Sequence, residues 1–377
     1  MPTHDVIVLG LGGLGSATTL SLARRGARVL GLERHALAHD LGSSHGQTRI
    51  IRKAYFEHPD YVPLLERAYA GWRALEEETS ARLYVPSGLL LTGPETGTVV
   101  GGTLRAAAAH GLPLERLNPD EIRRRFPDFS PHDDVVGVYE ADAGYLRVEA
   151  CVRAACDAAA RLGADLRPHT PALGWAADGD GVRVVAGDQT WTADRLVVAA
   201  GAWAPGLLPT LRPALHVQRQ VQLWFEAHPM ALGPGYPVFG VETEGSFFYG
   251  FPAISPGEVK VCEHGGGAPV SDPGALDRTL HPEDVTRVAA FTRAWLRGVS
   301  PRVARHAACM YTMSPDQHFL IDRLPQHPQV IVAAGMSGHG FKFAAGLGEA
   351  LADLALLGAT DQPIGFLSVS RPDVRAV

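Results

Sequence analysis

The sequence predicts an α/β fold of two domains, one of which combines both ends of the chain. Three observations predict it: a strand–turn–helix–strand pattern opens the chain, a second glycine-rich turn between a strand and a helix closes it, and alternating strands lie between them. A chain of 377 residues also suits two domains better than one. We therefore expect a discontinuous first domain (1–85, 140–215 and 320–377) and a strand-rich second domain (86–139 and 216–319).

The first element is a βαβ unit at the N-terminus. Asp5–Leu9 is a short apolar run typical of a buried parallel strand, and the glycine-rich segment Gly10–Gly15 follows it. Ser16–Arg25 has helical spacing of its apolar residues, and Arg28–Leu32 is a second apolar strand that ends at Glu33. Together these segments form the unit that binds dinucleotides in many α/β proteins.

The glycines of this unit fit the dinucleotide fingerprint GxGxxG at Gly10, Gly12 and Gly15. Glycine allows the tight turn, the approach of the backbone to a pyrophosphate and the close contact of helix and strand. The helix N-terminus offers free N–H groups to the phosphates, and Glu33 stands where an acid binds ribose hydroxyls. The pattern predicts a dinucleotide site but does not separate FAD from NAD.

The remaining elements follow from periodicity. We expect helices at Tyr61–Thr79, Val148–Leu162 and Glu283–Arg297, a hairpin of Val182–Val185 and Gln189–Thr192, and a buried strand at Arg195–Ala200. The final strand, Gln329–Ala334, opens into the turn Gly335–Gly340 and a helix to about Leu357. The alternating strands of the second domain run from roughly Val217 to Thr312.

Composition limits the class of partner. The formal net charge of −6 argues against nucleic acid or an anionic membrane surface, and no apolar run is long enough to span a bilayer. The strand pattern starts almost at the N-terminus and leaves no room for a signal peptide, so we expect a cytoplasmic protein. The chain has four cysteines, Cys151, Cys156, Cys262 and Cys309, and none of them forms a CxxC pair. We assign no metal ligands.

Lysine is rare, and its positions are informative. Only Lys53, Lys260 and Lys342 occur among 34 basic residues, so these are candidates for sites that need an amine whose proton affinity the surroundings can tune. On the strand Glu258–His264, Lys260 shares one face with Cys262 and His264. Alternation alone favours a solvent-facing polar side for these three residues.

Three separated motifs carry a family resemblance. His45-Gly46-Gln47-Thr48-Arg49-Ile50-Ile51-Arg52, Cys309-Met310-Tyr311-Thr312 and Gly338-His339-Gly340-Phe341-Lys342-Phe343 resemble the monomeric sarcosine oxidase and N-methyltryptophan oxidase family, within the D-amino acid oxidase group of flavoproteins. The resemblance runs from the first strand to the last few residues. It implies a two-domain FAD-dependent oxidoreductase with a Rossmann-like FAD domain and a substrate domain built on a large mixed β-sheet.

The resemblance implies a covalent cofactor. FAD would be attached through the sulfur of Cys309, whereas without the family match a small core residue is the ordinary role of a lone cysteine. The further residues implied to contact FAD lie in the fingerprint and in the three motifs: Gly10, Gly12, Gly15, Glu33, His45, Arg49, Gly338, Gly340 and Lys342.

The resemblance also implies a substrate site between the domains. Arg52 and Lys342 would hold the substrate carboxylate, with Arg49 near one face of the flavin. Without the motif, a surface salt bridge from Arg52 to Glu57 is the simpler interpretation.

The same resemblance implies that the strand face with Lys260 and His264 belongs to the active site. The equivalent of Lys260 lies near flavin N5 and promotes reaction with oxygen, and the equivalent of His264 contacts the substrate. Tyr249 and Tyr311 would supply aromatic walls.

Three positions depart from the family pattern. Cys262 stands where relatives have Gly or Lys, Gln47 replaces an acid, and Gly240 stands where sarcosine oxidase has a bulkier residue beside the substrate. We expect the small Gly240 to widen the substrate pocket.

The expected reaction is oxidation of an N-methyl or cyclic secondary amino acid by O2, giving an imine that water hydrolyses, and hydrogen peroxide. We expect a monomer whose partners are a small secondary amino acid and O2. N-methyltryptophan or pipecolate oxidation is an alternative within the family. The alternatives outside it are a dehydrogenase that passes electrons to a carrier and a catalytically silent FAD-binding subunit.

Overall fold

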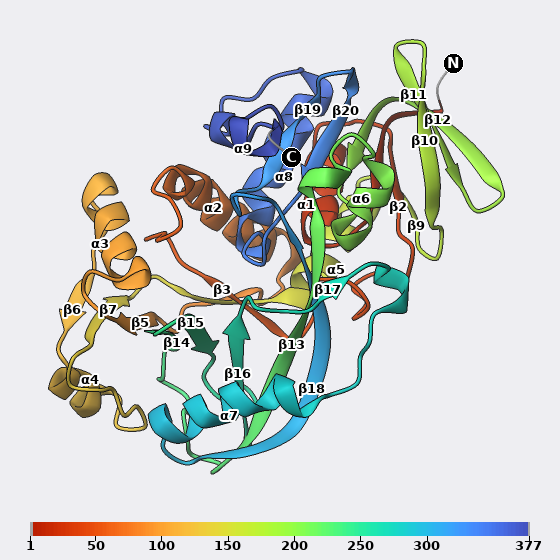
Figure 1. Cartoon of the computed structure of the whole chain (residues 1–377). Coiled ribbons are helices and arrows are strands. Elements are labelled where there is room, and N and C mark those ends of the chain that lie inside the picture. The colour runs from red at the N-terminus through yellow and green to blue at the C-terminus, as the bar shows by residue number, and fades with distance from the viewer. Residues whose placement is uncertain (1–2, 376–377) are drawn as a thin grey trace.

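Two large β-sheets organise the chain in this computed structural model, which describes residues 3–375 (Figure 1). One sheet has eight strands and combines both ends of the chain, and the other has nine strands from its middle. The predicted α/β class is therefore confirmed. No helix among residues 3–375 is long and apolar enough to cross a membrane.

The eight-stranded sheet is parallel at its centre. β1 (His4–Leu9) lies between β2 (Val29–Leu32) and β12 (Gln189–Val198), and β12 also pairs in parallel with β20 (His327–Ala334). This pairing brings the first and last thirds of the chain together. The other strands of this sheet are β9 (Asp165–Arg167), β10 (Ala172–Asp178), β11 (Gly181–Ala186) and β19 (Leu320–Leu324).

Both faces of β1 are buried, as in other parallel sheets. Val6 and Val8 join a core formed with the long helices, whereas Ile7 and Leu9 join a second core on the opposite face. The helices of the first core are α1 (Gly13–Arg24), α2 (Tyr61–Thr79), α5 (Val148–Arg161) and α8 (Ala344–Leu356). The short helices α6 (Ala204–Leu207) and α9 (Pro372–Arg375) each contribute a residue to the second core.

The nine-stranded sheet is mixed and carries α7 (Pro282–Trp295) across one face (Figure 1). Its longest pair is β13 (His216–Ala227) with the antiparallel β18 (Val299–Met313). The other strands are β5 (Leu89–Gly93), β6 (Glu115–Leu117), β7 (Val136–Glu140), β14 (Val238–Thr243), β15 (Ser246–Gly250), β16 (Glu258–His264) and β17 (Pro269–Val270). Helices α3 (Thr98–His110) and α4 (Pro119–Arg125) lie between β5, β6 and β7 in the chain.

A third sheet of three short strands carries the arginine motif. β3 (Thr48–Ile51) pairs with β8 (Gly144–Arg147), which also pairs with β4 (Tyr84–Val85). Arg49 lies on β3, and Arg52 follows it directly.

Most predicted elements are confirmed to within one or two residues at their ends, and three larger differences occur. The predicted strand Arg195–Ala200 is not separate: the return strand of the hairpin continues without a break as β12, because one extended segment pairs first with β11 and then with β1 and β20. Helix α1 starts at Gly13, three residues early. A 3-10 turn, Phe341–Phe343, separates the last glycine-rich turn from α8.

The strands follow the predicted domain segments. Those of the eight-stranded sheet lie within 1–85, 140–215 and 320–377, and those of the nine-stranded sheet within 86–139 and 216–319, except that β7 runs one residue past 139. The domain boundaries themselves stay a prediction.

Candidate active site

The turn between β1 and α1 needs glycine at two positions. Gly10 has a φ of +87°, and a Cβ atom there would lie 2.7 Å from the carbonyl oxygen of Ala199. A Cβ at Gly15 would lie 1.7 Å from the carbonyl oxygen of Gly10. At Gly12, by contrast, a Cβ would only touch Ser44 at 3.4 Å. The first and last glycines therefore shape the turn, and the middle one leaves room beside it.

Glu33 directly follows β2 and is a buried hydrogen-bond acceptor. Its carboxylate accepts hydrogen bonds from the backbone N–H groups of Leu11 at 2.8 Å and His35 at 3.0 Å, and it lies 3.2 Å from His39 Nε2. Burial alone raises the pKa of this carboxyl, but the contacts with His39 and the two N–H groups hold the pKa below its ordinary value. Glu33 is therefore ionised beside the glycine turn.

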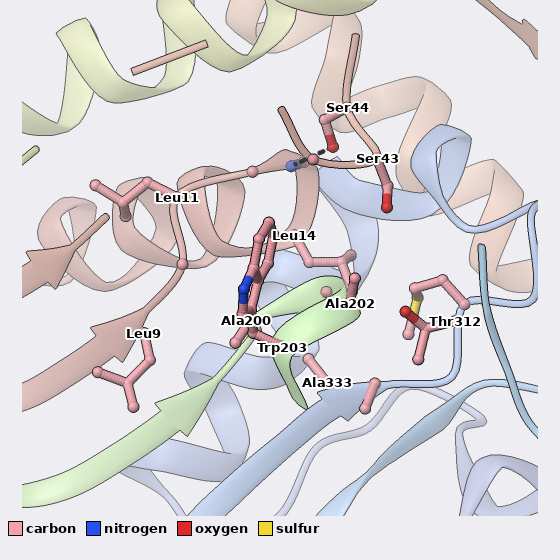
Figure 2. Close-up of a pocket in the computed structure, with 18 of the residues that line it drawn as sticks. Leu9, Leu11, Leu14, Ser43, Ser44, Ala200, Ala202, Trp203, Thr312 and Ala333 are labelled. Atoms are coloured by element: carbon pink, nitrogen blue, oxygen red, sulfur yellow. Dashed lines mark hydrogen bonds between the residues drawn. The ribbon is translucent and has the colours of Figure 1, made fainter. Parts of the chain in front are cut away.

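A cavity of about 310 Å³ begins at this turn. Figure 2 shows Leu9 and Leu11 on one side of it and Thr312 on the other, with the hydroxyl of Ser44 accepting a hydrogen bond from the backbone N–H of Gly13 at 3.1 Å. The cavity is lined by residues that lie in or beside the fingerprint and all three motifs: Gly10–Leu14, Glu33, Ser43, Ser44, Arg49, Met310–Thr312, Met336, Gly338, Gly340 and Phe341.

These residues fit a bound FAD. The start of α1 presents free N–H groups and a positive dipole end to phosphates, and the ionised Glu33 suits ribose hydroxyls. Thr312 Oγ1, in the cavity wall, and His45 Nε2 are buried polar atoms without a hydrogen-bond partner in the protein. Such atoms are uncommon in a folded protein and are consistent with a polar ligand.

Cys309 lies on β18 and is buried beside two basic groups. Its Sγ is 3.8 Å from Arg49 Nη2 and 3.7 Å from the carbonyl oxygen of Ser43. Burial raises the pKa of the thiol, but His45 and Arg49 outweigh it and hold the pKa at about 7. A large fraction of Cys309 is therefore thiolate near neutral pH, the form that acts as a nucleophile.

Lys260 lies on β16 at the edge of the arginine motif. Its Nζ donates to the carbonyl oxygen of Gly46 at 2.6 Å and, over longer distances, to the carbonyl and hydroxyl oxygens of Thr48 at 3.3 and 3.4 Å. It also lies 5.0 and 5.1 Å from the ring centroids of Trp224 and Phe251. Burial and the charge of Arg49 lower the pKa of Lys260 to about 7.

The face that Lys260 shares with Cys262 is buried, so the solvent-facing interpretation is wrong. The alternating residues Val259 and Val261 join the core under α7, as expected for a strand.

A second cavity, of about 70 Å³, adjoins the first. Arg49, Tyr311, Gly338 and Phe341 line both cavities. Besides Arg49, the charged lining residues of the small cavity are Arg52, Glu57 and Lys342, beside the imidazoles of His264 and His339, and its apolar side is formed by Ile50, Phe56, Leu91, Phe247 and Tyr249.

Arg52 is paired with Glu57, but not at the surface. The guanidinium donates to both carboxylate oxygens at 2.8 and 2.7 Å, and only 4% of Arg52 is exposed. The surface salt bridge is therefore wrong in its location: the pair lies inside the small cavity, where Lys342 also faces the carboxylate.

His264, Tyr249 and Tyr311 line the small cavity, and Tyr311 lines the larger one as well. Tyr311 Oη lies 3.3 Å from His264 Nδ1, and Tyr249 packs edge-on against the same imidazole. Burial lowers the pKa of His264 to about 4, so the ring is neutral at pH 7. A φ of +81° at Gly338, where a Cβ would lie 2.3 Å from the Tyr311 ring, explains the glycine that begins the last motif.

The structure shows the surroundings of two residues that depart from the family pattern, Gly240 and Gln47. A Cβ on Gly240 would lie 2.6 Å from Phe247 Cζ and 2.7 Å from Leu91 Cδ2. The expectation that Gly240 widens the pocket is wrong, because the Phe247 ring fills that space and itself lines the cavity. Gln47 lines neither cavity, and its side-chain oxygen accepts from Trp224 and Arg305.

Several residues of the small cavity were not predicted from the sequence: Phe56, Glu57 as a partly buried group, Phe247 and His339. His339 lies inside the last motif, and Phe56 and Glu57 follow the arginine motif closely, so proximity to those motifs was the available signal. Phe247 carried no signal beyond its strand.

The model of the FAD dependent oxidoreductase family matches residues 5–354. A monomeric sarcosine oxidase from Streptomyces avermitilis is 43% identical over 98% of both chains, and an N-methyl-L-tryptophan oxidase from Yersinia pestis is 38% identical over 96% of both. The solved structure of NikD, an unusual amino acid oxidase essential for nikkomycin biosynthesis, superposes with a TM-score of 0.85 at 27% identity, covering 98% of both chains. The chain is similar to these proteins over nearly its whole length.

Proposed function

This chain belongs to the FAD dependent oxidoreductase family, and from that premise we propose that it oxidises sarcosine or a related small N-methyl amino acid with O2. It is an FAD-dependent amine oxidase. For sarcosine the balanced reaction consumes O2 and water and yields glycine, formaldehyde and hydrogen peroxide. Bound FAD supplies the electron transfer, accepting two electrons from the substrate and passing them to O2.

One observation carries the choice of substrate: the small cavity, which shares part of its lining with the larger one, is lined by two buried cations, Arg52 and Lys342. Two cations suit one carboxylate, because a guanidinium fixes its orientation and an ammonium adds charge. The volume of about 70 Å³ favours a small amino acid.

Binding of the substrate carboxylate requires an exchange at Arg52. In this structure Glu57 occupies the guanidinium with two hydrogen bonds. A substrate carboxylate would replace Glu57 there and accept a further hydrogen bond from Lys342. A charge-assisted bond of this kind contributes about 1.5–3 kcal/mol.

The neutral imidazole of His264 suits an amine substrate. Because its pKa is about 4, His264 adds no positive charge beside the substrate nitrogen, while the nearby cations favour the uncharged amine. Only the uncharged amine has the electron pair that oxidation of the C–N bond requires. Tyr311 holds the imidazole in place at Nδ1.

Lys260 belongs to a different part of the site. It lines neither cavity, and its ammonium is fixed by Gly46 and Thr48. A buried positive charge there would stabilise the negative charge that develops on O2 as it is reduced, where the effective dielectric constant is low.

We also infer that FAD is attached through Cys309. The partly ionised thiol would bond to the 8α carbon of the flavin, with O2 taking up the two electrons and two protons released. In acid-denatured protein the yellow colour should stay in the pellet for wild type. Cys309→Ser should release it into the supernatant, and free flavin from fully loaded wild type would reject the linkage.

A substrate panel tests the function. Peroxide, formaldehyde and glycine should appear in equal amounts with sarcosine in air, and turnover should exceed that with N-methyl-L-tryptophan or pipecolate. Anaerobic bleaching by sarcosine without peroxide formation in air would identify a dehydrogenase. No bleaching by any of the three would indicate a silent subunit.

The name of the Streptomyces avermitilis relative supports a monomer, which light scattering would test.

A further inference from the structure

A chain of hydrogen bonds joins Lys342 to the protein backbone through two buried rings. Lys342 Nζ donates to Tyr55 Oη at 3.2 Å, Tyr55 Oη lies 2.7 Å from His339 Nδ1, and His339 Nε2 lies 3.0 Å from the carbonyl oxygen of Gln317. The four residues come from three separate segments: the stretch between β3 and α2, the turn after β18, and the turn before α8.

The chemistry of each group fixes the direction of this chain. A carbonyl oxygen only accepts, so His339 Nε2 carries a proton and donates to Gln317. Burial lowers the pKa of His339 to about 3, so the ring is neutral and Nδ1 is a bare acceptor. The Tyr55 hydroxyl therefore donates its single proton to His339 and turns its oxygen lone pairs toward Lys342. Burial and Glu57 raise the pKa of Tyr55, which keeps this proton in place.

The same accounting applies to the ammonium of Lys342. It has three N–H donors, of which one goes to Tyr55 and one to the carbonyl oxygen of His339 at 2.7 Å. The third has no acceptor in the protein among the described residues, and Lys342 lines the small cavity. The backbone of Lys342 is held as well, because Trp72 Nε1 donates to its carbonyl oxygen at 2.9 Å.

Tyr55 touches the second cation of the site too. The guanidinium carbon of Arg52 lies 4.1 Å from the centroid of the Tyr55 ring, within the range of a cation–π contact. Its ring thus supports Arg52, and its hydroxyl orients Lys342.

We propose that Tyr55, backed by His339, is a positioning residue that aims one N–H of Lys342 at the substrate carboxylate. This inference rests on the proposed function. The hydroxyl of Tyr55 gives the ammonium a fixed acceptor at its rear, so the free donor needs no reorganisation when a carboxylate arrives.

The hydroxyl also sets the pH range of carboxylate binding. Lys342 faces Arg52, Arg49 and Glu57, and its pKa is about 7, lowered by burial and then by Arg52. Removing the acceptor on Tyr55 removes a contact that favours the ammonium, so the pKa of Lys342 falls further. The loss of carboxylate affinity with rising pH should then begin at a lower pH.

The test is acetate binding to the holoenzyme, measured by calorimetry and by the flavin absorbance between pH 6 and 9. Tyr55→Phe keeps the ring under Arg52 and removes only the hydroxyl. It should weaken acetate binding by on the order of tenfold at pH 7 and move the pH midpoint downward. In a Lys342→Met background the same change should have no effect beyond about twofold.

Tyr61→Phe is the matched control. Tyr61 is also buried, and its hydroxyl contacts His318 Nδ1 at 3.1 Å rather than Lys342. Acetate affinity and the pH midpoint should stay at wild-type values in this variant. If Tyr55→Phe does not fold, His339→Gln interrupts the same chain and should shift the midpoint in the same direction.

The outcomes separate this inference from the function beneath it. Wild-type holoenzyme that binds no acetate would reject the carboxylate site and the positioning role together. Wild type that binds acetate, with Tyr55→Phe unchanged in affinity and midpoint, would reject the positioning role alone. A tenfold loss that persists in the Lys342→Met background would also reject it, because Tyr55 would not be acting through Lys342.

Discussion

Lys260 and Lys342 are both buried, and both have a pKa of about 7, yet their surroundings differ. Lys260 has three oxygen acceptors, from Gly46 and Thr48, and no salt bridge to any described carboxylate. Lys342 has two acceptors, a free third N–H and the Arg52–Glu57 pair beside it. An ammonium with all its donors used acts as a fixed charge, and one with a spare donor can bind a ligand.

The largest effect should come from removing the fixed charge. Lys260→Met keeps most of the side-chain volume and should lower kcat/KM for O2 by two or more orders of magnitude, or roughly 3 kcal/mol of barrier. Acetate affinity should stay near the wild-type value, because Lys260 does not line the small cavity. Oxygen-electrode kinetics at varied O2 would measure it, and an unchanged kcat/KM for O2 would end the proposed role.

Removing the spare N–H donor of Lys342 should weaken the binding of a carboxylate. Lys342→Met should raise the dissociation constant of acetate by roughly 10- to 100-fold, the loss of one charge-assisted hydrogen bond. Its kcat/KM for O2 should change little. Equal acetate affinities in this variant and in wild type would show that Arg52 alone holds the carboxylate.

The pH dependence of binding should follow the same lysine. A bound carboxylate favours the ammonium, so the pKa of Lys342 rises above about 7 in the complex. Below that pH both states are protonated and affinity is constant. Above it binding requires uptake of a proton, and acetate affinity should fall by up to tenfold per pH unit. A titration that is flat from pH 6 to 9 in wild type would contradict this, and Lys342→Met should give that flat profile.

The apolar side of the small cavity should give the smallest effect. Phe247→Ala removes the ring that fills the space over Gly240, so N-methyl amino acids larger than sarcosine should gain roughly tenfold in relative kcat/KM. Phe248→Ala is the control, because Phe248 lies on the opposite face of β15, stacked on Phe291. An equal change in both variants would indicate a general loss of packing.

The sequence predicted those parts of the site that depend only on neighbouring residues in the chain. The GxGxxG turn with Glu33 follows from a short segment, and Lys260, Cys262 and His264 share a face because strands alternate. The alternation could not tell which face is buried, since that depends on the β3 region packing over the sheet at Lys260.

The parts of the site that the sequence did not predict depend on contacts between residues far apart in the chain or on neighbouring strands. Glu57 lies five residues from Arg52, a spacing equally typical of an exposed pair, and it is partly buried beside Lys342, which comes from the other end of the chain. Phe247 crosses diagonally to cover Gly240 on the next strand, so a small residue did not mean an open pocket. Tyr55 and His339 meet only through the fold.

The division of labour between the two lysines is the central claim, and one double-mixing stopped-flow experiment tests it most directly. Wild type, Lys260→Met and Lys342→Met would each be reduced anaerobically by subsaturating sarcosine and then mixed with O2. The account predicts a crossed pattern: Lys342→Met is slow in reduction and normal in reoxidation, and Lys260→Met is nearly normal in reduction and at least 100-fold slower in reoxidation. Reduction that collapses in both variants, with reoxidation intact in both, would make Lys260 a substrate ligand and contradict the claim.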